Sequence, residues 1–258
     1  MELYSRKHGA HSSDLIILHG LFGMSDNWNT LGKKFADSFT VHLIDLRNHG
    51  KSPHSTEFNL EVMSQDLLNY INNNNIKEPI ILGHSLGGKV AMRFAFLYPD
   101  KLRKLIVVDI SPRRYDMNFH MKILSTIYRI PLEECNRRED VEDMLSTTIK
   151  DKGTRLFLLK NLYRDSNNKF TWKINVEVLL DSLSQIQEFE FNNIKCNTPS
   201  FFIRGEHSNY ITDPEDIDLI KEHFLDCTFS TILNSGHWVH ADNPKQIYQE
   251  VIHFCLRN

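Results

Sequence analysis

The sequence predicts an α/β fold, in which a mostly parallel sheet carries helices on both faces and a helical cap is inserted between two strands. Short apolar runs alternate with amphipathic segments over most of the 258 residues, which is typical of successive β-α units. Nearly all of these runs are apolar throughout rather than alternating, as expected for strands buried on both faces. One long stretch, residues 112–187, breaks this rhythm.

Six short apolar runs are predicted to be strands, and helical patterns separate most of them. The predicted strands lie within residues 14–20, 39–47, 78–85, 104–111, 199–206 and 227–234. The predicted helices that cover the sheet lie within residues 25–38, 59–75, 87–100 and 214–226. A last helix is expected to begin after Asn243, a suitable N-cap, with Pro244 at its first position.

Residues 112–187 contain four successive helical patterns and no convincing strand. Because strands precede and follow this stretch, we expect residues 1–111 and 188–258 to form the core and 112–187 to form the inserted cap. Apolar residues of the cap could line a channel above the core, although most such residues pack cap helices against one another. The candidates are Phe119, Ile123, Ile127, Phe157, Leu158 and Leu162.

Composition and charge exclude several classes of protein. The net charge is −3 and the basic residues are scattered, so no nucleic acid is expected as a partner. No apolar run approaches the roughly 18 residues of a membrane span, and the first residues lack the apolar region of a signal peptide. The four cysteines are far apart, so neither a metal site nor a disulfide framework is expected, and a cytoplasmic location is the default.

A serine lies between two glycines where a predicted strand turns into a helix. The residues Gly83-His84-Ser85-Leu86-Gly87 match G-x-S-x-G, with a strand before and a helix after. So sharp a turn needs glycines for space, and it lifts the hydroxyl of Ser85 out of the sheet edge. The N–H of Leu86, at the start of the helix, could donate to an oxyanion that forms beside this serine.

A serine nucleophile needs a base, and His237 is the best candidate. It follows the last predicted strand and precedes the last helix, on a loop that a rigid scaffold can aim. His240 is the main rival, although it lies nearer to the start of that helix.

The base in turn needs a carboxylate, for which two residues are candidates. Asp109 ends the strand at 104–111, at the sheet edge where open α/β sheets place their sites, and the order Ser85, Asp109, His237 is that of a hydrolase. Asp109 could instead cap the turn that follows it. In the type of fold predicted here, the acid usually follows the strand at 199–206, but no aspartate is present there. Glu206 is therefore the alternative candidate for the acid.

A second oxyanion donor is expected from His19-Gly20-Leu21-Phe22-Gly23, the glycine-flanked loop after the first predicted strand. Leu21 is the first candidate and Phe22 the second. The alternative is an ordinary β-to-α turn. Two donors matter because loss of one such hydrogen bond typically costs about 10²- to 10³-fold in rate.

These segments together resemble the α/β-hydrolases, and more narrowly the small esterases of the YbfF type and the related abhydrolase-domain 11 proteins. The resemblance rests on HGLFG, DLRNHGKSP, GHSLGGK, VVDISP, FLLKNL and GHWVHADNP, of which RNHG, DISP and GHWVH are the most specific. It implies hydrolysis of carboxylic esters, with acyl thioesters as further substrates. It also implies Ser85 as nucleophile, His237 as base and Asp109 rather than Glu206 as acid.

The expected partner is therefore a small acyl ester or thioester, with short to medium acyl chains and no cofactor. The chain is expected to act as a monomer or homodimer. Arg113 and Arg114, just after Asp109, could meet an anionic carrier such as coenzyme A, although solvated side chains are the commoner case. An acyltransferase, a perhydrolase, a carbon–carbon hydrolase and a non-catalytic binding protein remain as alternatives, since all can share this fold.

Overall fold

A seven-stranded sheet organises the computed structural model, which describes residues 1–187, 194–212 and 214–257. The strand order is β1-β3-β2-β4-β5-β8-β9, with β1 antiparallel to β3 and all other neighbours parallel. The strands are β1 (Ser5–His8), β2 (Asp14–Leu18), β3 (Thr40–Ile44), β4 (Ile80–His84), β5 (Lys104–Val108), β8 (Ser200–Gly205) and β9 (Cys227–Ile232). The predicted fold class is confirmed.

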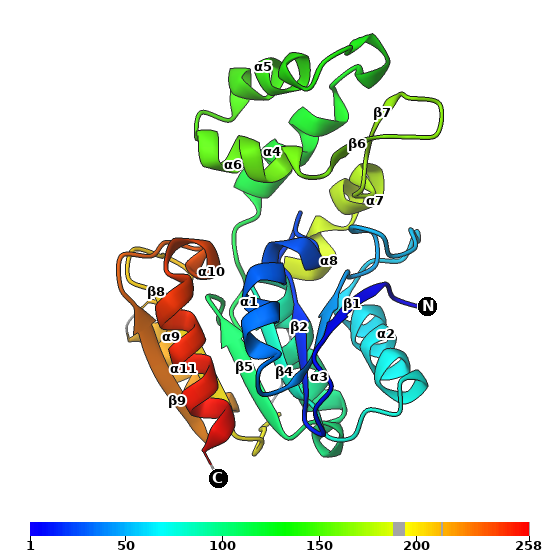
Figure 1. The fold of residues 1–258 in the computed structure, drawn as a ribbon. Coiled ribbons are helices and arrows are strands. Elements are labelled where there is room, and N and C mark those ends of the chain that lie inside the picture. The colour runs from blue at the N-terminus through cyan, green and yellow to red at the C-terminus, as the bar shows by residue number, and fades with distance from the viewer. Residues whose placement is uncertain (188–193, 213, 258) are drawn as a thin grey trace.

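Helices cover both faces of this sheet (Figure 1). One face packs against α1 (Asn29–Phe35) and α11 (Pro244–Leu256), and the other against α2 (Leu60–Asn73), α3 (Leu86–Leu97) and α9 (Glu215–His223). All five residues of β4 are buried, as its continuous apolar sequence predicts for a central strand. The side chain of Asn243 caps α11 by accepting a hydrogen bond from Gln246 N at 3.2 Å.

Between β5 and β8 the chain forms a layer that lies beyond the carboxyl ends of the strands (Figure 1). Its helices are α4 (Asn118–Tyr128), α5 (Arg138–Thr148), α6 (Lys152–Leu159), α7 (Val176–Asp181) and α8 (Leu183–Gln187). We call residues 112–187 the cap segment. The predicted boundary at residue 188, where the cap was expected to end and the core to resume, lies outside the described residues.

The expectation that the cap segment contains no strand is wrong. β6 (Leu162–Arg164) and β7 (Phe170–Trp172) form a two-stranded antiparallel sheet. The turn between them contains Asn168 in the left-handed region, at φ 61°. Aromatic residues and threonine on both sides of a polar Asn-rich turn favour such a hairpin, and this signal was hidden by the apolar pattern of α6 just before it.

The first strand, β1, also has no counterpart among the predicted strands. Its sequence, Ser-Arg-Lys-His, is polar, and its residues are half-buried or exposed. It lies at the edge of the sheet, where its backbone hydrogen bonds to β3 replace apolar burial. Three short 3₁₀ helices complete the described elements: η1 (Ser25–Trp28), η2 (Pro99–Lys101) and η3 (Leu132–Glu134), with the one-turn helix α10 (Val239–Asp242) before α11.

No helix in the described part of the chain is both long and apolar enough to cross a membrane.

Candidate active site

Ser85 occupies the sharp turn between β4 and α3. Its backbone lies at φ 51° and ψ −116°, a conformation that costs a non-glycine residue free energy. A Cβ on Gly83 would lie 2.1 Å from the carbonyl oxygen of Gly87, and one on Gly87 would lie 2.4 Å from that of Leu18. No side chain fits at such distances, so the two glycines of the motif are required by close approach of the backbone.

The loop after β2 lies directly against this turn. A Cβ on Gly20 would come within 3.2 Å of the Cβ of Ser85. The N–H of Phe22 is already bonded, since it donates to His49 Nε2 at 3.3 Å. The next amide before it, that of Leu21, therefore becomes the better candidate for the second oxyanion donor, beside that of Leu86 at the start of α3.

His49 holds the loop in place as a neutral imidazole. Its Nδ1–H donates to the carbonyl of Arg47 at 2.9 Å, which leaves Nε2 as the acceptor for Phe22 N–H. Burial, with the nearby His19, lowers the pKa of His49 to about 3, so this arrangement persists at neutral pH. The RNHG motif thus supports the loop that carries Leu21.

His237 and Asp109 form a direct hydrogen bond. His237 Nδ1 donates to Asp109 Oδ2 at 2.7 Å. Asp109 is fully buried at φ 54°, and its other oxygen accepts from Gly205 N at 3.0 Å. The hydroxyl of Ser208 also donates to Oδ2. Three donors thus hold the buried carboxylate in place beside His237.

Ser208 lies on the turn after β8, where the sequence lacks the expected aspartate. Its hydroxyl contacts the oxygen of Asp109 that binds His237. The ring of Tyr210, two residues further on, stacks on the imidazole of His237 with centroids 3.8 Å apart. Neither Ser208 nor Tyr210 was among the sequence candidates. The turn Gly205-Glu206-His207-Ser208, with serine at the position of the expected aspartate, is the signal that could have identified Ser208.

The two alternative candidates lie elsewhere. Glu206 is exposed and accepts a hydrogen bond from Asn234 N at 2.7 Å, whereas the carboxylate that His237 binds is that of Asp109. His240 stacks on Trp28 at 4.5 Å, and burial, with the nearby His237, lowers its pKa to about 3.

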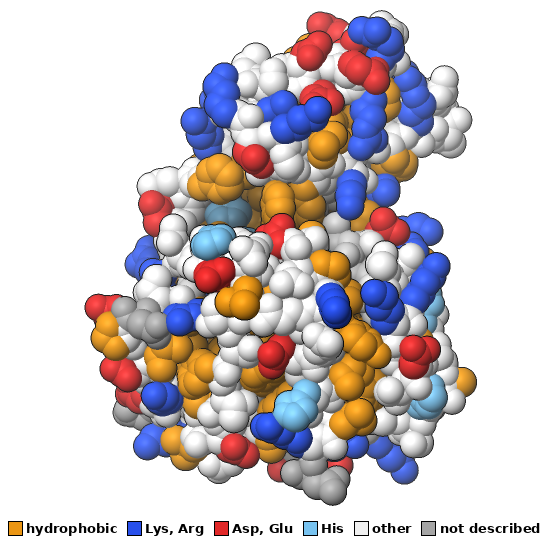
Figure 2. Space-filling model, turned by 60° about the vertical axis from the view of Figure 1, so that its left-hand side comes forward, with side chains coloured by type: hydrophobic (Ala, Val, Ile, Leu, Met, Phe, Trp, Pro, Cys, Tyr) orange, Lys and Arg blue, Asp and Glu red, His pale blue; other side chains and the backbone are white. Residues whose placement is uncertain are grey.

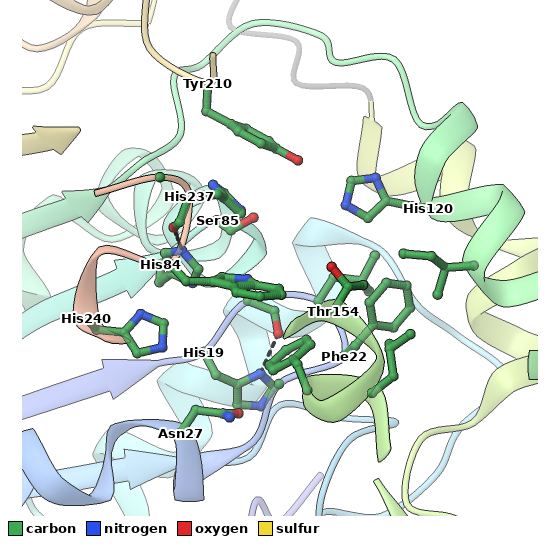
Figure 3. Close-up of a pocket in the computed structure, with 18 of the residues that line it drawn as sticks. His19, Phe22, Asn27, His84, Ser85, His120, Thr154, Tyr210, His237 and His240 are labelled. Carbon is green, nitrogen blue, oxygen red and sulfur yellow. Dashed lines mark hydrogen bonds between the residues drawn. The ribbon is translucent and has the colours of Figure 1, made fainter. Parts of the chain in front are cut away.

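Ser85 and His237 both line one pocket of about 400 Å³, and Figure 3 shows their side chains at the same wall. The hydrogen bonds of the described residues do not include one between Ser85 Oγ and His237 Nε2. The serine hydroxyl can change its position by rotation about the Cα–Cβ bond.

His84, the residue before the serine, fixes the loop of His237. Its Nε2–H donates to the backbone carbonyl of His237 at 2.8 Å. Complete burial, with His237 nearby, keeps the pKa of His84 well below its ordinary value, so it remains a neutral donor. Strand β4, which ends at His84 just before Ser85, therefore also positions the loop that carries His237.

The pocket opens between the cap segment and the core, where Figure 2 shows hydrophobic side chains gathered beside histidines. Four of the six cap candidates line it: Phe119, Ile123, Phe157 and Leu158. Ile127 and Leu162 are buried but are not among the described lining residues, so they serve to pack the cap segment. The pocket wall is therefore mainly apolar on the cap side.

The two arginines after Asp109 are engaged with the protein. Arg113 pairs with the buried Asp216 at 2.9 Å and lies over the ring of Tyr115. Arg114 donates to the side chain of Gln187 at 3.4 Å. The described residues include no cluster of three or more histidine, cysteine or acidic side chains that could hold a metal ion.

Comparisons with known proteins agree with this architecture. The family model for the alpha/beta hydrolase fold matches residues 15–244. Esterase YbfF of Escherichia coli is 30% identical over 241 residues, which cover 93% of this chain and 92% of that protein. The sn-1-specific diacylglycerol lipase ABHD11 of Mus musculus is 34% identical over 249 residues, 93% of this chain and 80% of that protein. A solved structure described as a marine microorganism esterase is 42% identical, with a TM-score of 0.95 over 98% of this chain and 99% of that one.

Proposed function

The chain belongs to the α/β-hydrolase fold family, and on this premise we propose that it is a serine esterase with Ser85, His237 and Asp109 as its catalytic triad. The activity is hydrolysis of carboxylic esters, in keeping with relatives and a structural neighbour named as esterases or lipases. The observation that carries the triad is the 2.7 Å hydrogen bond from His237 to the buried Asp109, in a pocket that Ser85 also lines.

In the first half of the reaction, Ser85 Oγ attacks the acyl carbon while His237 Nε2 takes the hydroxyl proton. The carbonyl π electrons move to the oxygen, which the N–H groups of Leu21 and Leu86 stabilise. The tetrahedral intermediate then expels the alcohol oxygen, which receives the proton from His237. An acyl-Ser85 ester remains.

In the second half, water attacks the acyl-Ser85 ester and gives its proton to His237. Collapse of the second tetrahedral intermediate releases the carboxylic acid and returns the proton to Ser85. Throughout, Asp109 keeps the proton of the neutral imidazole on Nδ1 and stabilises the imidazolium that forms twice. The Gly205 and Ser208 donors hold the carboxylate of Asp109 in position for this task.

The substrates are esters with short to medium acyl chains, and acyl thioesters undergo the same two steps. A pocket of about 400 Å³ falls in the range of small-molecule sites, and apolar cap residues line part of it. Arg113, which is engaged with Asp216, does not supply a free cation for a charged carrier.

A serine-reactive fluorophosphonate probe tests the proposal directly. The wild-type protein should be labelled at one site and lose its ester hydrolysis in step, while Ser85→Ala should show neither labelling nor turnover of p-nitrophenyl acetate. Ser64→Ala is the matched control, because Ser64 is also buried but its hydroxyl donates to backbone carbonyls, of Leu60 at 2.8 Å and of Val90 at 3.5 Å. Labelling of Ser85→Ala at the wild-type rate would refute the proposed nucleophile.

A further inference from the structure

Ser85 lies where two pockets of very different size meet. The larger holds about 400 Å³ and the smaller about 30 Å³. Four residues line both pockets: Leu21, Ser85, His120 and Tyr210. A reacting carbon bonded to Ser85 therefore borders both pockets.

The two pockets differ in the described residues that line only one of them. His237 lines only the larger pocket, together with its neighbours Gly236 and Trp238. Leu86, whose N–H is a proposed oxyanion donor, lines only the smaller one. The proton donor thus lies on the side of the large pocket.

The tetrahedral carbon has four substituents, and three of their directions are set by the proposed mechanism. One is the bond to Ser85 Oγ, and a second is the oxyanion, which points at the N–H groups of Leu21 and Leu86. The third is the alcohol oxygen, which must face His237 to receive its proton, so the alcohol extends into the large pocket. The acyl chain takes the direction that remains, away from His237 and into the small pocket.

We propose that the small pocket is the acyl site and the large pocket is the alcohol site. This assignment narrows the short to medium acyl chains proposed above to short ones, of about two to four carbons, and makes the alcohols bulky and apolar. This assignment rests on the proposed function, since it uses the proposed roles of His237, Leu21 and Leu86.

The size of the small pocket sets the limit on the acyl chain. With about 30 Å³ against about 400 Å³ for the large pocket, the small pocket has room for only a short acyl chain. Its wall is mainly apolar, with Ile110, Met117 and Ile186 among its lining residues. The Lys89 amine donates to the carbonyls of Ile186 and Gln187, each at 3.1 Å, which directs this charge to the protein backbone.

The large pocket suits a hydrophobic alcohol. Phe119, Ile123, Phe157, Leu158 and Trp238 contribute large apolar side chains to its lining. The rings of Phe157 and Trp238 lie 5.0 Å apart and join the cap segment to the loop that carries His237. A bulky alcohol therefore gains apolar contacts in this pocket that the acyl pocket has no room to offer.

Two series of esters test the assignment by kcat/KM. In p-nitrophenyl esters from acetate to decanoate, the value should fall about 10- to 100-fold between butyrate and octanoate, as forcing extra methylenes into a filled site does. In acetates of ethanol, hexanol, 2-phenylethanol and 1-naphthol, the value should rise with the size of the alcohol. Long acyl chains hydrolysed as fast as acetate, with large alcohols penalised, would overturn the assignment.

Two matched variants move the limits separately. Met117→Ala enlarges the small pocket, so the octanoate to acetate ratio should rise about tenfold. Ile123→Ala enlarges only the large pocket and should leave that ratio within about twofold of the wild type. Ile186→Val serves as a second, milder enlargement of the small pocket. A ratio that responds to Ile123→Ala and not to Met117→Ala or Ile186→Val would reverse the two sites.

The same panel separates failure of the assignment from failure of the proposed function. If Ser85 is labelled by the fluorophosphonate probe and long acyl esters are the best substrates, only the assignment of the pockets is wrong. If no ester of either series is hydrolysed and Ser85 is not labelled, the esterase proposal fails, and the assignment fails with it.

Discussion

Replacing Asp109 by Asn tests the proposed acid with little change of shape. Asn tolerates the left-handed backbone that Asp109 adopts at φ 54°, so the turn can keep its conformation. The amide oxygen can still accept from Gly205 N, while the amide nitrogen would replace the oxygen that His237 now contacts. An amide N–H at that place would favour the imidazole tautomer whose Nδ1 accepts and whose Nε2 carries the proton, and this tautomer cannot accept the proton of Ser85.

The expected loss follows from the charge as well as the tautomer. With about 4 Å between the carboxylate and the imidazolium and an effective dielectric constant of about 20, the lost attraction is about 4 kcal/mol, or about 10³-fold in rate. The unfavourable tautomer adds to this loss. We therefore expect kcat to fall about 10³- to 10⁴-fold.

Initial rates on p-nitrophenyl acetate measure this effect, with circular dichroism and urea unfolding as checks that each variant is folded. Glu206→Gln is the matched control, because it makes the same acid-to-amide change on a largely exposed side chain that contacts Asn234 N. We expect it to change kcat by less than about threefold. An Asp109→Asn enzyme with more than a tenth of the wild-type kcat, or a large loss in Glu206→Gln, would refute the reasoning.

Three further predictions concern residues around the site. Ser208→Ala should lower kcat about tenfold, because Asp109 loses one hydrogen-bond donor. Ser208 Oγ contacts the oxygen of Asp109 that binds the imidazole, so Ser208→Asp combined with Asp109→Ser should be at least about tenfold more active than Asp109→Ser alone. Rates of p-nitrophenyl acetate hydrolysis test both expectations. His240 has a pKa of about 3 in the folded protein, so the unfolded chain binds its proton first, and the unfolding free energy should fall as the pH drops from about 6.5 toward 3. Urea unfolding at pH 7 and 4.5 measures this loss of unfolding free energy, which should be smaller by about 2 kcal/mol in His240→Gln than in the wild type. An equal loss in the two proteins would contradict the lowered pKa of His240. The Asn161 amide donates to the Phe22 carbonyl at 2.8 Å and so joins the cap segment to the loop of residues 19–23. Asn161→Ala should therefore lower the free energy of unfolding by about 1–2 kcal/mol and kcat/KM about fivefold. Equal kcat/KM in variant and wild type would refute this role of Asn161.

Most of the sheet could be predicted because its central strands carry their structure in local sequence. β2 and β4 are continuous apolar runs, and such runs have few stable places other than the middle of a covered sheet. β1 could not be predicted in this way, because a polar segment becomes an edge strand only when the exposed edge of β3 is available. The hairpin of β6 and β7 was missed because it directly follows a helical pattern.

The site shows a similar division. The G-x-S-x-G motif predicts the place of Ser85, because close backbone contacts at Gly83 and Gly87 restrict what the sequence can be. The choice between Asp109 and Glu206 depends on which strand end faces the histidine loop, and only the fold brings these positions together. The small pocket beside Ser85 was invisible for the same reason, since its lining comes from residues between 21 and 210.

The cap segment leaves the sheet at the end of β5 and returns to it at β8, the neighbouring strand. Val108 and Ile203 are direct partners in these two strands, which lie about 4.8 Å apart. Because β5 and β8 are parallel, the chain that leaves β5 at Val108 must run back to the amino end of β8 at Ser200. The contacts of Asp109 with Gly205 and His237 lie within the core and do not involve the cap segment. A change in the length or sequence of the cap segment would therefore alter the pocket that it lines while leaving these contacts of Asp109 in place.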